Sequence, residues 1–236
     1  MSNELDSSQI AFHMWDRTHV ITLVILLALF ITLFSFRHVL RPYRNIIYFV
    51  VGSSLLLSRL SLDIWYVLTE SWSVQTSLPL ELCSIASLLS AVMLFTRNTF
   101  LFEVLFFIAI SGSLQALITP ELAFGFPHFR YVQFFFDHFL LFITPFLLIL
   151  FEGYTIQFRS LIKAFLFLNG LALFTFIMNV LFRANYMFLM DKPSTSSLLD
   201  LLGPHPFYLL MLEGVALLIF LSLYGLYTFF WGRFST

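Results

Sequence analysis

Charged residues are scarce in this chain. Of its 236 residues, 12 are Lys or Arg and 13 are Asp or Glu, together 11% of the sequence, whereas charged residues make up about 25% of an average soluble domain. The formal net charge of −1 argues against the basic surface that binds nucleic-acid phosphates. The composition therefore excludes an ordinary soluble domain, and we expect no nucleic-acid partner.

Cysteine is rarer still, because Cys83 is the only one. A single thiol cannot form an intrachain disulfide, so cysteine usage does not reveal the redox compartment. The chain also lacks a G-x-S-x-G elbow, a glycine-rich phosphate loop and an H-E-x-x-H motif. These absences argue against the common serine-hydrolase, nucleotide-binding and zinc-protease sites.

Apolar residues make up most of the sequence. Hydrophobic residues make up 60% of the chain, and 32 residues are Phe, which predicts an integral membrane protein. Cutting the chain at charges and prolines leaves apolar stretches near the length of about 20 residues that a helix needs to cross a bilayer. They lie near residues 18–36, 45–69, 80–96, 99–118, 131–151, 160–182 and 206–230. The predicted fold class is all-α, one polytopic membrane domain over 1–236 with seven transmembrane helices.

Only the polar residues Arg97, Asn98 and Thr99 interrupt the apolar sequence where the stretches 80–96 and 99–118 meet. Together the two stretches are too long for one crossing of about 20 residues. We therefore expect a tight hairpin of two helices rather than one long helix.

The distribution of basic residues predicts the orientation, because Lys and Arg favour cytoplasmic loops. One set of predicted loops holds Arg37, Arg41, Arg44, Arg97, Arg159, Lys163 and Arg233, and the other holds Arg17, Arg130, Arg183 and Lys192. We expect the first set inside the cell. The chain is then a multi-pass protein of the cell membrane with its N-terminus outside and its C-terminus inside.

Several polar side chains fall in the outer half of the predicted helices. They are Arg59, Asp63, Cys83, Gln115, His138 and Glu213. Ionisable groups at this depth are costly unless they pair, face the bundle interior or line a wet cavity, so a functional site is the first hypothesis. Arg59 and Asp63 stand at i, i+4 and can form an ion pair. We expect this pair, with Glu213, to support the site, and a purely structural ion pair is the alternative.

The nucleophile candidate, Cys83, also has a structural alternative. A lone cysteine in an apolar helix is commonly a small packing residue, and the serines at i+4 and i+7 from it are typical of close helix packing. His138 alone fits a satisfied core histidine equally well. Glu81 is expected to project from nearly the opposite side of the helix to Cys83, and Asp137 away from His138.

Histidines raise the question of a metal. Five of the six are predicted on or near the outer side, namely His13, His19, His128, His138 and His205, and imidazole, thiolate and carboxylate suit zinc. No two of them stand at i, i+4 on a predicted helix. We therefore expect no metal and no cofactor.

The connection over residues 183–208, "RANYMFLMDKPSTSSLLDLLGPHPFY", is long and mixes apolar with polar residues. Ser194 to Ser196 offer N-caps for a short helix over 196–202, which Gly203 and Pro204 would end. Such a segment would lie in the membrane interface above the helix ends. Arg183 and Lys192 are then candidates for binding a phosphate headgroup, and a plain amphipathic connector is the alternative.

Four segments carry a resemblance to a known family. They are "LPLELCSIASLL" (78–89), "GSLQALITPEL" (112–122), "FFFDHFLLFITP" (134–145) and "NYMFLMDKPSTSSLLDLLGPHPFY" (185–208). Their order and spacing resemble the YwaF-type bacterial membrane proteins and their eukaryotic relatives, the transmembrane protein 164 family. The resemblance runs from about residue 50 onward. It implies an acyltransferase that remodels phospholipids with a cysteine nucleophile and a histidine partner, and the motif match places these roles on Cys83 and His138.

These observations together predict a cysteine-dependent phospholipid acyltransferase or lipid hydrolase that acts from the outer leaflet. Cys83 would form a thioester with an acyl chain, and His138 would be its base. Gln115 would orient the substrate or stabilise the oxyanion, a role that amide side chains can fill. The partners are membrane lipids. The alternative is a non-enzymatic lipid or small-solute binding protein, or a transporter subunit, whose polar residues bind a ligand without chemistry.

Overall fold

The computed structural model describes residues 11–192 and 198–231, which are almost entirely helical. The long helices are α1 (Arg17–Ser35), α3 (Arg44–Leu68), α4 (Leu82–Thr96), α5 (Thr99–Ile118), α6 (Phe129–Glu152), α7 (Phe158–Phe182) and α8 (Phe207–Phe230). The short ones are α2 (Arg37–Leu40) and the 3-10 turns η1 (Arg41–Tyr43), η2 (Tyr186–Phe188) and η3 (Leu198–Leu202). Within the described residues the only β-pairing is one bridge between Ala11 and Phe124, so the all-α prediction is confirmed for this part of the chain.

Each long helix matches one predicted apolar stretch to within a few residues. Six of them are long and apolar enough to cross a membrane, whereas α4 has 15 residues, fewer than the roughly 20 that a straight crossing requires. The crossing of the membrane by α4 and the direction of insertion therefore stay predictions. The proposed N-caps Ser194 to Ser196 lie outside the described residues, and the turn that follows them is a 3-10 turn rather than an α-helix.

The hairpin between α4 and α5 has a local cause. Arg97 closes α4 in the left-handed conformation, with φ 54°, and a residue in this conformation cannot continue a right-handed helix. The next residue, Asn98, accepts a hydrogen bond from the backbone N–H of Leu101 and so caps the start of α5. The prediction of two helices rather than one long helix is confirmed.

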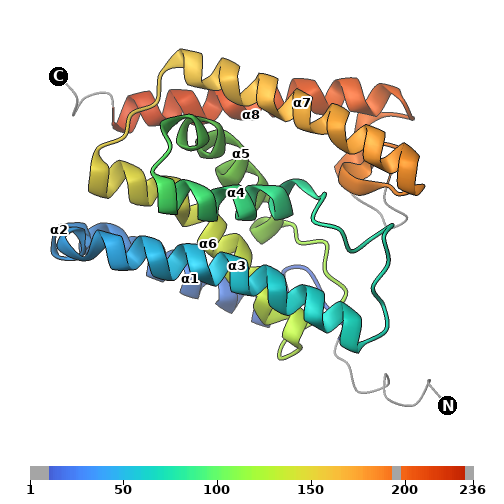
Figure 1. Cartoon of the computed structure of the whole chain (residues 1–236), viewed down its shortest axis with the longest axis horizontal. Helices are drawn as coiled ribbons and strands as arrows, with labels where there is room; N and C mark the ends of the chain where they lie inside the picture. The colour runs from blue at the N-terminus through green and yellow to red at the C-terminus, as the bar shows by residue number, and fades with distance from the viewer. Residues whose placement is uncertain (1–10, 193–197, 232–236) are drawn as a thin grey trace.

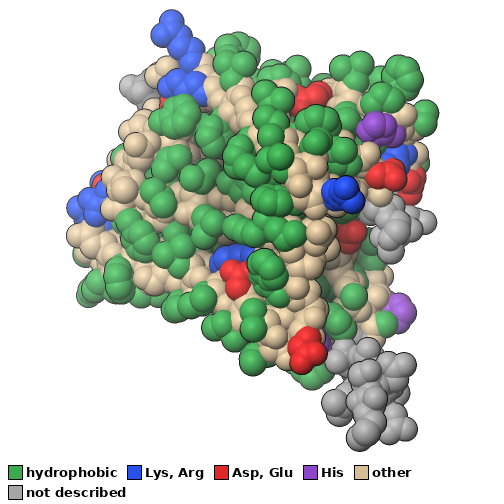
Figure 2. All heavy atoms as spheres, turned by 45° about the vertical axis from the view of Figure 1, so that its right-hand side comes forward, with side chains coloured by type: hydrophobic (Ala, Val, Ile, Leu, Met, Phe, Trp, Pro, Cys, Tyr) green, Lys and Arg blue, Asp and Glu red, His purple; other side chains and the backbone are tan. Residues whose placement is uncertain are grey.

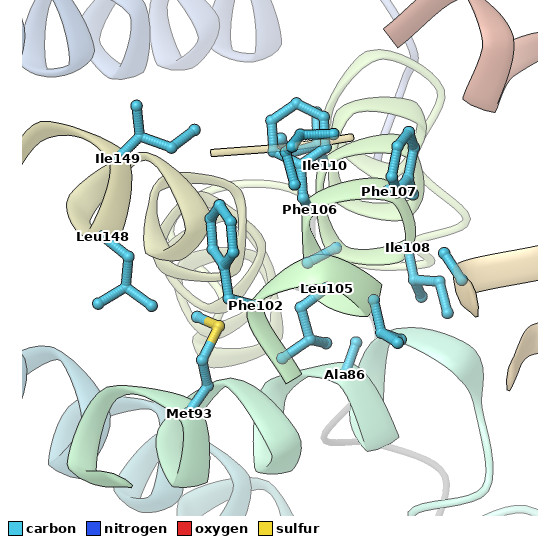
Figure 3. Packing of buried hydrophobic residues seen from close by; sticks show 14 of the residues in the cluster. Ala86, Met93, Phe102, Leu105, Phe106, Phe107, Ile108, Ile110, Leu148 and Ile149 are labelled. Atoms are coloured by element: carbon cyan, nitrogen blue, oxygen red, sulfur yellow. The ribbon is translucent and has the colours of Figure 1, made fainter. Parts of the chain in front are cut away.

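The long helices run roughly side by side, with α5 and α6 in the middle of the bundle, α1 and α3 on one side and α7 and α8 on the other (Figure 1). Helix α5 packs against α4, α6, α7 and α8, and α6 packs against α1, α3, α4 and α5. The main apolar core lies where α4, α5 and α6 meet, with Met93, Phe102 and Leu148 pointing toward one another (Figure 3).

The outer helices are apolar on every side but are scarcely buried. Of the most apolar window of each helix, 56% is buried in α5 and α6, but only 6% in α1 and α8. Hydrophobic side chains accordingly cover the face of the molecule, while most charged side chains lie toward its two edges (Figure 2). This surface suits a bilayer, because the lipid chains that surround it there are as apolar as the side chains themselves.

The two edges hold different groups of residues. One, hereafter the Cys83 end, carries the loops over 69–81 and 119–128 and the described residues 183–192 and 198–206, with the N-terminus of α4 between them. The other, hereafter the Glu152 end, carries α2, η1 and the turns over 97–98 and 153–157. The polar residues singled out in the sequence lie in the half of the bundle nearer the Cys83 end.

Candidate functional site

Cys83 is the second residue of α4, and its half-buried thiol rests against α5. A Cβ atom built on Gly112 would lie 3.3 Å from Sγ of Cys83. The absence of a side chain at Gly112 therefore allows α5 to approach the thiol closely, as small residues do between membrane helices.

Gly112→Ala is expected to slow the reaction of Cys83 with a small maleimide, because the new methyl group would lie 3.3 Å from Sγ and the reaction rate of a thiol depends on access to its sulfur. The added methyl group would force its neighbour to move by a few tenths of an ångström. Gly170→Ala on α7 is the matched control, since nothing lies within 4 Å of its new methyl group. Equal labelling rates in parent, Gly112→Ala and Gly170→Ala would contradict this contact.

Ser87, one turn after Cys83, links α4 to α6. Its hydroxyl donates to Oδ2 of Asp137 at 2.8 Å, and both side chains are buried. A second contact joins the same helices farther in, where Thr144 Oγ1 lies 3.4 Å from Ser90 Oγ. Asp137 therefore faces α4, and the expectation that it projects away from His138 stays a prediction.

His138 follows Asp137 on α6 and is half-buried. Its Nδ1 atom lies 2.8 Å from the carbonyl oxygen of Phe134, and its ring packs on that residue's ring with centroids 4.1 Å apart. A carbonyl only accepts hydrogen bonds, so in this arrangement Nδ1 carries the proton and Nε2 keeps its lone pair. Among the described residues Nε2 has no hydrogen-bond partner, so the imidazole is held in the tautomer that a general base requires.

Glu81 precedes α4 at the Cys83 end, and its carboxylate is turned inward. Its Oε2 accepts a hydrogen bond of 3.0 Å from the backbone N–H of Met187 in η2. The same turn is fixed by Tyr186, whose hydroxyl donates to Val74 O and accepts from Leu78 N. The loop before α4 and the loop after α7 are thus joined next to Cys83, and the expectation that Glu81 projects from nearly the opposite side of the helix to Cys83 stays a prediction.

The environment of Glu81 makes a prediction about pH. Burial raises the pKa of Glu81 from 4.5 to about 7, the hydrogen bond from Met187 opposes this rise, and the charge of Glu121 adds to it. Because the folded-state pKa lies above the unfolded value, the stabilisation is complete below the unfolded pKa and is lost as the pH rises through about 7. The ionised carboxylate is therefore the form that the folded protein tolerates poorly.

Glu81→Gln is expected to remove this pH dependence, since the amide oxygen still accepts from Met187 and cannot ionise. Between about pH 5 and pH 8 the parent should lose up to about 3 kcal/mol of unfolding free energy that the variant keeps. Thermal unfolding in detergent at the two pH values measures the difference, and Glu70→Gln, in the exposed part of the same loop, is the control. Parallel pH profiles of parent and Glu81→Gln would contradict the burial of this carboxylate.

Arg59 and Asp63 form the ion pair that their spacing allows. Arg59 Nε donates to Asp63 Oδ2 at 3.2 Å, its Nη2 donates to Oδ1, and Nη2 also reaches the carbonyl oxygen of Ser77 at 2.6 Å. The Arg59 side chain is 11% exposed and that of Asp63 38%. Glu213 takes no part in this pair and accepts a hydrogen bond from Asn169 of α7 at 3.0 Å instead.

The remaining predicted site residues lie on exposed or partly exposed surface. Gln115 is exposed and stands one turn beyond Gly112 on α5, so it shares the face that touches Cys83. Arg183 is exposed and closes α7 in the left-handed conformation. Lys192 is already engaged, with Nζ 3.8 Å from Asp200 Oδ1 and 5.5 Å from the ring centroid of Tyr208.

The structure adds a further arginine, Arg130, to this end of the bundle. Arg130, at the start of α6, donates to Gln133 and lies 5.9 Å from the ring centroids of both Trp65 and Tyr66. No carboxylate pairs with it among the described residues. Within that same part of the chain no cluster of three His, Cys, Asp or Glu side chains surrounds a point that would hold a metal ion.

Several of these residues were missed or set aside in the sequence: Glu81, Gly112, Arg130 and Asp137. One signal was available, since the acidic Asp137 in the middle of an apolar helix needs a buried partner. The pairing of Gly112 with Cys83 had no such signal, because it depends on how two helices cross. The partner of Glu81 depends in turn on a loop 106 residues farther along the chain.

Six apolar helices of crossing length, with an apolar core between them, define a polytopic membrane protein. Comparison with protein families matches residues 12–224 to the TMEM164 family, and the chain belongs to this family. The expected relation to the transmembrane protein 164 family is thereby confirmed, whereas the relation to YwaF-type bacterial proteins stays a prediction. No curated protein and no solved structure matches the chain.

Proposed function

We propose that the protein is a lipid acyltransferase or lipid hydrolase that carries the acyl group on Cys83. The observation that supports this most is the state of His138, whose Nδ1 is bound to the Phe134 carbonyl and whose Nε2 is free within the described residues. The Ser87–Asp137 hydrogen bond fixes α4 against α6 at the same depth. A nucleophile and a base then stand on two helices that are locked together.

The first half of the reaction transfers the acyl group to the protein. Nε2 of His138 takes the thiol proton, and the sulfur attacks the ester carbonyl carbon of a lipid. The bond from this carbon to the alcohol oxygen breaks, and the alcohol leaves with the proton returned by His138. The amide of Gln115, one turn beyond Gly112 on α5, would donate to the oxyanion of the intermediate.

The second half regenerates the thiol. An acceptor hydroxyl gives its proton to His138 and attacks the thioester carbon, so the carbon–sulfur bond breaks and the thiolate recovers the proton. A lysophospholipid as acceptor makes the protein an acyltransferase, and water makes it a hydrolase. The buried carboxylate of Asp137 lies beside this centre and stabilises the imidazolium that forms in each half.

Three basic side chains at the Cys83 end are candidates for binding the headgroup phosphate. Arg183 and Lys192 follow α7 in the chain, and Arg130 adds a guanidinium that has no carboxylate partner in the described residues. A guanidinium suits phosphate because its donors form a fixed fork. With the orientation predicted from the basic residues, this headgroup belongs to the outer leaflet of the cell membrane.

The test is covalent capture of the acyl group. Protein incubated with a phospholipid that carries a clickable acyl chain should become labelled, and neutral hydroxylamine should remove the label. The chain has one cysteine, so a hydroxylamine-sensitive label reports Cys83 directly. Absence of any label under conditions in which the lipid is bound would overturn the proposal.

The second candidate function is lipid or small-solute binding without chemistry, by a binding protein or a transporter subunit. It is favoured by the contact of the Cys83 sulfur with Gly112, which is also the contact that a packing cysteine would make. A binder should retain its ligand unchanged in Cys83→Ala. The covalent label and the ligand content of this variant therefore separate the two functions.

A further inference from the structure

The Glu152 end, on the opposite side of the molecule from Cys83, contains two hollows. One, of about 430 Å³, is lined by His38, Arg41, Pro42, Arg44, Phe151 and Glu152. The other, of about 420 Å³, is lined by Phe34, Arg37, Leu150, Phe230 and Trp231. Both are lined by residues of the same two stretches of chain, 34–44 and 150–152. Neither hollow contains a residue of the proposed catalytic site.

The two hollows differ in chemistry. The second is walled almost wholly by apolar side chains, and its rings pack against one another, with centroids 5.9 Å apart for Phe34 and Trp231. Among the described residues that line it the only charged one is Arg37, whose Nη1 donates to the Phe34 carbonyl at 3.0 Å. This hollow suits a hydrocarbon chain that enters beneath a cationic rim.

The first hollow carries a surplus of positive charge. Its single carboxylate, Glu152, is already shared by Arg44 at 3.2 Å and Arg97 at 3.7 Å. Arg41 uses its Nε to reach the carbonyl oxygen of Phe151, and neither Arg41 nor Arg37 has a carboxylate partner among the described residues. Two guanidinium groups thus face this end without an acidic side chain to neutralise them, although both are held in place by backbone carbonyls.

The geometry points to a binding site for an anionic phospholipid: we propose that one acyl chain occupies the hollow of Phe34, Leu150, Phe230 and Trp231 while Arg37 and Arg41 bind the headgroup phosphate. Charge complementarity selects the anionic lipid, since paired arginines fit phosphate in a planar, forked arrangement. Basic pockets between membrane helices bind lipid headgroups in this way. The site is independent of the proposed acyl transfer, because it lies at the other end of the bundle.

Trp231 gives this site its own reporter. The four tryptophans are Trp15, Trp65, Trp72 and Trp231, and the first three lie toward the Cys83 end. A variant with Trp15→Phe, Trp65→Phe and Trp72→Phe leaves Trp231 as the only fluorophore. In mixed micelles, a brominated phosphatidylglycerol should quench Trp231 at lower concentration than a brominated phosphatidylcholine does.

The arginines are tested in the same background. Each of Arg37→Gln and Arg41→Gln should weaken the preference for brominated phosphatidylglycerol about fivefold, the effect of one interfacial cation. Arg159→Gln is the matched control, because Arg159 is an exposed basic residue near the same end that lines neither hollow. Equal quenching by the two lipids, or a preference unchanged in both arginine variants, would overturn the site.

A second measurement needs no variant. Native mass spectrometry of the parent chain should show phosphatidylglycerol retained after phosphatidylcholine has dissociated, and excess glycerol phosphate should not displace it. Displacement by glycerol phosphate would show that the arginines bind a free phosphate and that the apolar hollow contributes nothing, which would also overturn the proposal.

Discussion

Cys83→Ala and His138→Ala are each expected to abolish most of the acyl transfer, and the double variant should be no slower than Cys83→Ala alone. A nucleophile and its base act as one unit, so their effects do not add. We expect a loss of about 10⁴ or more for Cys83→Ala by analogy with other nucleophiles, and of about 10² to 10⁴ for His138→Ala, the range of general-base catalysis. Transfer of a labelled acyl chain between two phospholipids in nanodiscs measures all three rates.

His13→Ala is the control for the loss of an imidazole, because His13 is exposed at the same end of the molecule. It should transfer at the parent rate. Additive losses in the double variant would mean that Cys83 and His138 contribute separately, and a transfer rate unchanged in Cys83→Ala would remove the thiol from the reaction altogether.

The second large effect is expected on stability. Asp63→Ala leaves the largely buried guanidinium of Arg59 without its carboxylate, and removal of one partner from a buried ion pair typically costs about 3 to 5 kcal/mol. The Asp63 side chain is 38% exposed, so we expect a loss of unfolding free energy at the lower end of this range, about 3 kcal/mol. Unfolding in mixed detergent micelles measures this cost.

The double variant Arg59→Met with Asp63→Leu is the matched control. Replacing both charges with apolar residues of similar size avoids the stranded charge, so most of the stability should return. The carbonyl of Ser77 still loses its donor, which leaves a deficit of about 1 kcal/mol. If Asp63→Ala were as stable as the parent, the guanidinium of Arg59 would have to reach water.

Local signals in the sequence predicted most of the fold. The charges and prolines between apolar stretches marked the helix ends, and the polar residues Arg97, Asn98 and Thr99 were enough to predict a hairpin. The Arg59–Asp63 pair followed from a spacing of four residues on one helix, because both side chains belong to the same local structure. Each of these predictions depends on neighbours in the chain.

The candidate site was harder to predict, because its contacts join helices. Asp137 and His138 are consecutive, so one helix rotation of about 100° separates them, and this separation suggested that only one faces the site. Helix α6 touches α1, α3, α4 and α5, so residues on several sides of it are buried. Asp137 meets Ser87 of α4, and His138 bonds within its own helix.

The contacts of Glu81 with the loop after α7 could not be predicted from the sequence for another reason. Met187 and Phe188 adopt left-handed backbone conformations, with φ 56° and 51°, and non-glycine residues adopt this conformation uncommonly. The turn that they form brings the N–H of Met187 to Glu81, and Asn179 holds it by bonding both the N–H and the carbonyl of Tyr186. Such a turn is specified by tertiary contacts rather than by its own residues.

The most direct test of the account is the rate at which a small maleimide modifies Cys83 as a function of pH, in the parent and in His138→Ala. The thiolate is the reacting form, and a free thiol with a pKa of about 8.5 is mostly protonated near neutral pH. If His138 takes the proton from Cys83, the parent should react faster than His138→Ala near pH 7, and the two rates should converge at high pH. Equal and slow labelling of the two proteins across the whole pH range, with Cys83 shown to be accessible, would instead identify it as a packing residue between α4 and α5.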